Sequence, residues 1–117
     1  QEQDVLPWLR FLHQGGADLA SNCTGAFLLA EAGLLDGKTA TTHWGFSQQF
    51  RHHYPQVKLN ERELITRDGN IFCAGGGTAW RDLTILLVER YCGADLAREL
   101  STTRKAPALA NWRKWFT

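Results

Sequence analysis

The chain has 117 residues, of which 44% are hydrophobic and 21% are charged, a composition and length that suit one globular domain with a buried core. Its formal net charge of +1 argues against a surface that coats nucleic acid, because phosphate binding needs clustered Lys and Arg. The sequence has no apolar run of transmembrane length and no signal-peptide pattern, so we expect no membrane contact.

The first predicted elements are a helix and a buried strand. Asp4 is expected to cap the helix and Pro7 to lie in its first turn. A strand then runs from Ala17 and breaks at Cys23 into a second helix, which Gly33 caps at its C-terminus.

Cys23 is the first candidate catalytic residue. A cysteine between a strand and a helix is typical of a nucleophile elbow, in which backbone N–H groups of the new helix point at whatever the sulfur touches. The partial positive charge of a helix N-terminus also favours a thiolate over a thiol. Asn22, Thr24 and Gly25 flank the sulfur, and we expect them to line a ligand pocket. A buried cysteine near a helix-starting glycine is also common in ordinary α/β cores.

His43 is the second candidate. A β-prone run over residues 38–42 follows an Asp36–Gly37 turn and predicts a strand that delivers His43 to its C-terminal end. In an open α/β sheet, ligands bind outside the carboxyl ends of the strands. We therefore expect Cys23 and His43 to share one site, although a lone histidine at a strand end is more often a structural residue.

The second half of the chain predicts a short helix, a hairpin and two more helices. The short helix stops before Tyr54–Pro55. Strands over residues 64–67 and 71–74 flank a turn at Asp68-Gly69-Asn70. An apolar helix, expected to be buried on most faces, follows the glycines at 75–77 and ends at Cys92–Gly93. The last helix runs from Ala94 to about Ser101.

The glycine run over residues 75–77 lies between a strand and a helix. Gly75 and Gly76 are predicted to line the pocket through their backbone, since no Lys-Ser/Thr pair follows as a phosphate-binding P-loop requires. Asp82 follows in the helix, where it would orient the pocket or stabilise the helix dipole. Trp44 and Trp80 could form an aromatic wall suited to a cationic ligand, although such pairs more commonly serve packing.

The chain contains three cysteines and no methionine. Three cysteines at spacings that fit neither a disulfide framework nor a zinc ribbon indicate a reducing compartment, so we expect a cytoplasmic protein. Cys73 and Cys92 lie in apolar segments and are expected in the core. We expect no cofactor and no metal, because His52 and His53 lack the spacing of a metal pair. The missing initiator methionine predicts a piece of a longer product.

Four ordered segments resemble the ThiJ/PfpI superfamily: Cys23-Thr24-Gly25, Leu28 to Gly37, Thr41-Thr42-His43-Trp44 and Cys73 to Leu83. The resemblance covers residues 17–100 and is closest to the N-terminal domain of AraC-type transcriptional regulators. It implies an α/β, class I glutamine amidotransferase-like fold. The chain would be the later part of a doubly wound, mostly parallel flavodoxin-like sheet with helices on both faces.

The same resemblance implies a domain organisation. Residues 1–101 would be the C-terminal part of the ThiJ/PfpI-like domain, and residues 102–117 a tail or linker towards a possible DNA-binding domain. The family places several strands before this point. A missing segment or another chain would therefore complete the sheet.

Two functions follow from the resemblance. In the favoured one, the pocket at Cys23 senses a small metabolite, the protein is a homodimer, and DNA is bound only through a domain outside this chain. In the alternative, a hydrolase or hydratase, Cys23 attacks an amide, isonitrile or carbonyl carbon. The Thr24 N–H then helps to hold the oxyanion and His43 moves the proton. The acidic partner that enzymatic relatives supply from early in the domain is not found here, which favours the sensor.

Overall fold

Strand β5 (Ile71–Ala74) lies at the centre of the main sheet in this computed structural model, which describes residues 2–102. Its neighbours are β1 (Leu19–Asn22), which is parallel to it, and β4 (Ile65–Asp68), which is antiparallel. All four β5 side chains are buried, as expected for a strand covered on both faces. A second, two-stranded sheet pairs β2 (Thr39–Ala40) in parallel with β3 (Lys58–Leu59).

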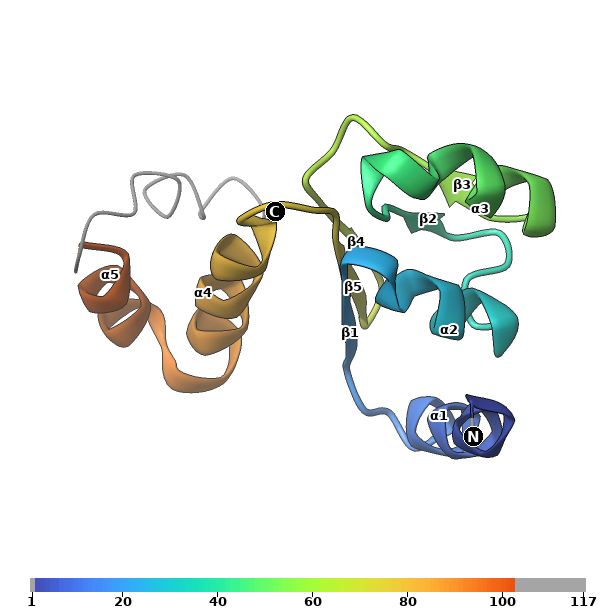
Figure 1. The fold of residues 1–117 in the computed structure, drawn as a ribbon. Coiled ribbons are helices and arrows are strands. Elements are labelled where there is room, and N and C mark those ends of the chain that lie inside the picture. The colour runs from blue at the N-terminus through green and yellow to red at the C-terminus, as the bar shows by residue number, and fades with distance from the viewer. Residues whose placement is uncertain (1, 103–117) are drawn as a thin grey trace.

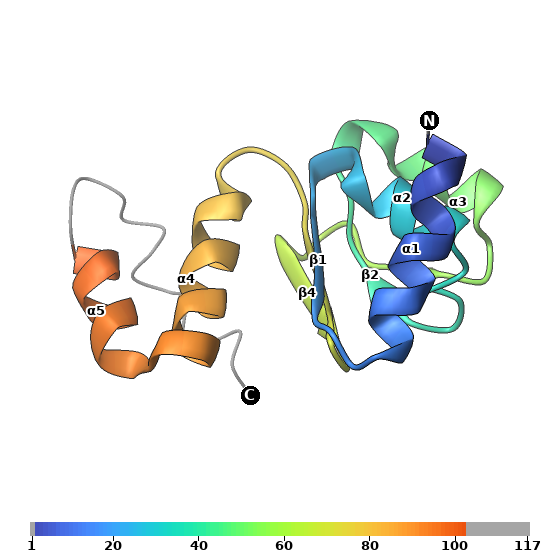
Figure 2. The same ribbon diagram turned by 90° about the horizontal axis from the view of Figure 1, so that it is seen from below.

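Helices cover both faces of the main sheet (Figure 1). On one side lie α1 (Glu2–Gln14), α2 (Ala26–Glu31) and α3 (Ser47–His53). On the other side lies α4 (Ala79–Cys92), with α5 (Ala94–Thr102) packed beside it. Figure 2 shows the same division from below. The predicted doubly wound α/β class with helices on both faces is confirmed.

Alternation of side chains along the strands produces two hydrophobic cores. The first combines inward-facing residues of β1 and β5 with side chains of α2 and α3: Leu19, Ile71, Cys73, Leu29 and Phe50. The second combines the alternate residues of β4 and β5 with side chains of α4: Ile65, Phe72, Ala74, Leu83 and Leu86. The burial of β5 therefore depends on both helical layers.

Glycines in the sequence predict several ends of helices and strands correctly. Gly33 follows α2 with a φ of 79°, and Gly69 in the β4–β5 turn has a φ of 62°, conformations that favour glycine. The helix that ends before Gly93 is also confirmed, but only one side of α4 is buried, because its outer residues, Trp80 and Thr84 among them, face solvent.

Other local predictions are wrong. Helix α1 begins at Glu2, so Asp4 is not its cap and Pro7 lies inside the helix. The strand predicted over residues 38–42 is shortened to β2, and its partner β3 was not predicted, since a two-residue strand carries no periodic signal.

The outer edge of β1 has no strand partner within residues 2–102. An unpaired edge exposes backbone N–H and C=O groups that another strand can bind. The outer edge of β4 is likewise without a strand partner in this sheet among these residues, so both edges are open to further strands. The tail predicted over residues 102–117 lies, apart from Thr102, outside the described residues.

Replacing Leu86 with Ala should lower the free energy of unfolding by about 2–5 kcal/mol, because the change leaves a cavity between α4 and β5. Leu96 on α5 is 42% exposed and supplies the matched control. Leu96→Ala should change the stability by less than about 0.5 kcal/mol. Urea unfolding followed by circular dichroism measures the free energy of unfolding of both variants. Equal losses of stability would contradict the burial of Leu86 in the second core.

Asp18 links the start of β1 to the end of α4. Its carboxylate accepts hydrogen bonds from Arg90 Nε at 2.5 Å and from the Tyr91 hydroxyl. The bond from Arg90, supported by that from Tyr91, holds the pKa of Asp18 below its ordinary value of 3.8. A carboxyl whose pKa is lower in the folded state stabilises the fold above its unfolded pKa, and this contribution disappears as the pH falls through the folded value.

We therefore expect Asp18→Asn to destabilise the chain at neutral pH. The difference from the parent protein should begin to shrink as the pH falls below about 4 and should vanish once the pH has fallen through the lower folded-state pKa, where the native carboxyl is also protonated. Thermal unfolding across this pH range measures the effect. Asp95→Asn is the control, because Asp95 is a fully exposed partner of Arg98. A stability difference that persists unchanged at low pH would show that the Asp18 charge is not responsible.

Candidate ligand site at the carboxyl ends of the strands

The carboxyl ends of β1 and β5 lie side by side. Their register pairs Asn22 with Ala74, so the next residues, Cys23 and Gly75, leave the sheet at neighbouring positions. The chain after β2 reaches the same edge, because the Thr42 hydroxyl donates a hydrogen bond to the Cys23 carbonyl oxygen at 3.0 Å. Backbone pairing and this bond thus bring together the three segments that carry Cys23, His43 and the glycine run.

Cys23 occupies a strained turn. Its φ is 58°, and among residues 2–102 it is the one non-glycine residue with a positive φ. A left-handed backbone at such a residue costs about 1–3 kcal/mol and is commonest at functional sites. A short 3-10 turn over Cys23–Gly25 then leads into α2. The thiol is partly buried. The strand–cysteine–helix order is as predicted, and the nucleophilic role stays a prediction.

The imidazole of His43 is held by its neighbours. Its Nδ1 accepts a hydrogen bond from the Gly45 N–H at 3.0 Å. The Trp44 ring stacks on it with centroids 5.3 Å apart and an interplanar angle of 24°. Gly76 lies against the ring so closely that a Cβ there would be 2.6 Å from His43 Cδ2. A side chain at position 76 would therefore displace the imidazole.

A pocket of about 350 Å³ opens beside Trp44 and Gly76, and neither Cys23 nor His43 lines it. We call it the glycine-loop pocket. Of the residues predicted to bind a ligand, Trp44, Gly75, Gly76 and Asp82 all line it. Asp82 is buried, whereas Trp44 is 73% exposed and presents its indole to solvent. Trp80 does not line this pocket and instead lies under the guanidinium of Arg81, so the predicted pair of tryptophans is not formed here.

Two further carboxylates were missed by sequence reasoning. Glu61 and Glu63 both line the glycine-loop pocket. Glu61 forms an ion pair with Arg51 of α3. The segment that carries them is fixed by the Thr41 hydroxyl, which donates to the Glu63 carbonyl oxygen at 3.0 Å. No local pattern around residues 60–64 indicates this placement, because it depends on how the chain between β3 and β4 crosses the edge of the sheet.

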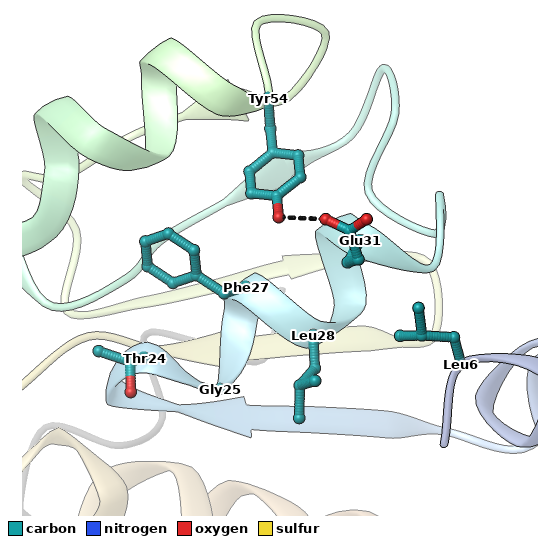
Figure 3. A pocket seen from close by; sticks show the side chains of 7 residues that line it. All are labelled: Leu6, Thr24, Gly25, Phe27, Leu28, Glu31 and Tyr54. Atoms are coloured by element: carbon teal, nitrogen blue, oxygen red, sulfur yellow. Dashed lines mark hydrogen bonds between the residues drawn. The ribbon is translucent and has the colours of Figure 1, made fainter. Parts of the chain in front are cut away.

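A second pocket of about 540 Å³ lies along α2, and we call it the α2 pocket (Figure 3). Thr24 and Gly25 line it together with Glu31 and Tyr54, whose hydroxyl donates to Glu31 Oε1 at 2.6 Å. The sequence predicted one ligand pocket, but the structure distributes its residues between two. Asn22 is exposed and lines neither of them.

The remaining thiols differ in exposure. Cys73 is fully buried, as predicted. Burial raises the pKa of its thiol. The prediction that Cys92 lies in the core is wrong: it is exposed, because it is the last residue of α4, beyond the segment that packs on β5.

Among residues 2–102, no three His, Cys, Asp or Glu side chains are grouped in a way that could hold a metal ion. Within the same residues, no helix has the length and apolar character needed to span a membrane.

The helices and strands described above form an α/β protein with a cysteine at a strand-to-helix turn. The model of the DJ-1/PfpI family matches residues 1–90. The chain therefore belongs to the DJ-1/PfpI family.

Curated relatives include both regulators and an enzyme. The chain is 41% identical over 97 residues to the HTH-type transcriptional regulator CdhR of Pseudomonas aeruginosa, covering 83% of this chain and 29% of the regulator. It is 33% identical over 99 residues to isonitrile hydratase of Pseudomonas putida, covering 84% of this chain and 42% of the enzyme. The chain thus spans less than half of either relative.

Solved structures give the same family of folds. A transcriptional regulator protein from Vibrio parahaemolyticus matches with a TM-score of 0.74 and 30% identity, over 83% of this chain and half (50%) of that one. Drosophila melanogaster DJ-1beta matches with the same TM-score of 0.74 at 22% identity, over 83% of this chain and 50% of that one. The second likeness is evidence for the fold alone.

We expect Cys73 to be the slowest of the three thiols to react with iodoacetamide in the folded chain, because its sulfur is buried and its thiol pKa is raised. In a Cys92→Ser background, which removes the exposed competitor, Cys23 should be alkylated at least about tenfold faster than Cys73. Mass-spectrometric mapping gives both rates. Equal alkylation rates of Cys23 and Cys73 in the folded chain, or faster labelling of Cys73, would contradict the accessible position of Cys23 at the end of β1.

Proposed function

We propose that this chain is part of a metabolite-sensing domain of an AraC-type transcriptional regulator. The observation that carries the proposal is the glycine-loop pocket. Trp44 follows β2, Gly75 and Gly76 belong to the glycine run, and Asp82 lies in α4. Each was predicted from the sequence, and all four line this one pocket. The similarity to HTH-type regulators supports the same assignment.

The pocket has the features of a binding site for a small molecule. Trp44 offers an exposed indole face, the glycines let a ligand approach the backbone, and Asp82 supplies a buried carboxylate. Helix α4 begins at this pocket and ends beside α5. A ligand that contacts the start of α4 would therefore act on a rigid element that extends to the far side of the domain.

The proposal includes the following partners and location. The ligand is a small metabolite, and the protein acts as a cytoplasmic homodimer. DNA is bound only through a domain outside this chain, and no membrane is involved. The net charge of +1 agrees with a domain that does not itself bind DNA.

A cysteine-dependent hydrolase or hydratase is the second candidate. It is favoured by the strained backbone of Cys23, whose φ is 58°, and by the similarity to isonitrile hydratase. In this mechanism the Cys23 sulfur would attack the substrate carbon, and the Thr24 N–H would hold the developing negative charge.

Trp44→Ala should raise the metabolite concentration for half-maximal transcription by about tenfold, equivalent to ~1.4 kcal/mol of binding free energy. Trp44 is largely exposed, so the change should leave the fold intact. Trp80→Ala is the matched control, because Trp80 is 47% exposed and does not line the glycine-loop pocket. A reporter gene driven by the full-length regulator, assayed over a panel of metabolites, measures both. Equal effects of the two variants would argue against the glycine-loop pocket as the metabolite site.

Cys23→Ser separates the two candidate functions. A sensor needs the shape and polarity of the site, so its transcriptional response should fall by less than about threefold, whereas a covalent mechanism loses nearly all turnover without the thiolate. Reporter expression and isonitrile hydration are measured on the same full-length variants. Hydratase activity that disappears in Cys23→Ser, with no metabolite-dependent transcription in the parent protein, would establish the enzyme.

A further inference from the structure

We infer that the glycine-loop pocket is selective for an organic cation, and that the Glu63 carboxylate sets this selectivity. The inference rests on the ligand site proposed above and deepens it, because it names the chemical class of the ligand. The class comprises small molecules that carry an ammonium or guanidinium group.

Every charged side chain that lines this pocket is acidic. Glu61, Glu63 and Asp82 are among the lining residues, and no Lys, Arg or His is. Asp82 is buried and Glu63 is exposed, so the pocket presents carboxylates both at depth and at the protein surface. An anionic ligand would meet like charges at both levels, whereas a cationic group would be attracted at each.

The charge of Glu61 is already compensated within the protein. Arg51 of α3 forms an ion pair with Glu61 and also donates from Nη2 to the Leu59 carbonyl oxygen at 3.3 Å. Among residues 2–102, the Glu63 carboxylate forms no such ion pair. Glu63 is therefore the carboxylate at the surface of the pocket that a ligand can bind without displacing another side chain.

The spacing of the carboxylates suits a cation larger than a metal ion. Within the part of the chain that the structure describes, they do not form a group of three that could hold a metal. A metal ion needs its oxygen ligands at about 2.0–2.6 Å, whereas an ammonium or guanidinium group carries several N–H donors that reach carboxylates lying further apart. The volume of about 350 Å³ is sufficient for a small organic molecule.

Trp44 adds an aromatic face to these charges. Its ring stacks on His43 with centroids 5.3 Å apart, yet 73% of the residue is exposed, so the indole remains available to a ligand in the pocket. Tryptophan is the side chain whose π face attracts a cation most strongly. Carboxylates and an indole that line the same pocket are together complementary to a positively charged group.

The N-terminus of α4 also borders this pocket and by itself would favour an anion, because a helix N-terminus carries a partial positive charge. Thr78 and Ala79 at the start of the helix line the pocket, and Asp82 lies in the first turn. The Asp82 carboxylate offsets the partial charge of the helix from within the protein. The helix therefore does not reverse the preference that Glu63 sets.

Three simple compounds separate the effect of charge from that of shape. Tetramethylammonium and tert-butanol have nearly the same shape, but only the first is charged, and acetate is a small anion. Each is titrated at constant ionic strength into the full-length protein labelled with fluorotryptophan, and the ¹⁹F signal of Trp44 is assigned with Trp44→Phe.

We expect tetramethylammonium to shift the Trp44 signal with an affinity at least about threefold higher than that of tert-butanol. Acetate should leave the signal unchanged. Equal or stronger binding of acetate or tert-butanol, or no effect of tetramethylammonium, would overturn the inference.

Glu63→Gln tests the residue to which the selectivity is assigned. The change keeps the size of the side chain and removes its charge, so the affinity for tetramethylammonium should fall about threefold. Asp36→Asn is the matched control, because it changes the net charge equally at an exposed carboxylate that lines neither pocket. An unchanged affinity in Glu63→Gln, or equal losses in the two variants, would overturn the role of Glu63.

Arg51→Gln should change the affinity in the opposite direction. It removes the positive charge that compensates Glu61, so the affinity for tetramethylammonium should rise about twofold, whereas the loss of a merely structural contact would lower it. A fall in affinity would contradict the account of the charges. These titrations need no inducing metabolite. A preference for acetate, together with a metabolite that induces transcription and shifts the Trp44 signal, would refute the cation and leave the proposed site in place.

Discussion

The parallel pairing of β1 with β5 is the interaction on which the rest of the structure depends. Its register sets Asn22 against Ala74 and so places Cys23 beside Gly75 at one edge of the sheet. A slip of one residue would reverse the faces of the strand, moving Leu19 out of its core. The hydrogen bond from the Thr42 hydroxyl to the Cys23 carbonyl oxygen, which ties the chain after β2 to this edge, also depends on this alignment.

The same pairing couples the site to the cores. β5 is buried on both faces, and its last residue leads directly into the glycine run that borders the pocket. The first turn of α4 carries Asp82 into the site, while Leu83 and Leu86 of the same helix pack against β5. Residues that line the pocket and residues that pack in the core thus lie within one short segment, so a ligand in this pocket would contact the start of a packed helix.

The parts of the fold that depend on short sequence patterns could be predicted from the sequence. Glycines at turns and the break at Cys23 located the helices, the hairpin and the edge that carries the site. The separation into two pockets could not be predicted, because the α2 pocket depends on Tyr54 meeting Glu31 across 23 residues. The exposure of Cys92 likewise depends on where α4 leaves the sheet, which apolar composition does not reveal.

The proposed metabolite site lies where the three chain segments meet. The most direct measurement is ¹H–¹⁵N chemical-shift mapping of the complete sensing domain against a library of soluble metabolites. We expect a metabolite able to induce transcription to shift the Trp44 indole N–H and the Gly75 and Gly76 amides, and to leave the exposed Trp8 indole on α1 unchanged. An inducing metabolite that binds without moving the Trp44 and Gly76 signals would contradict the proposed site.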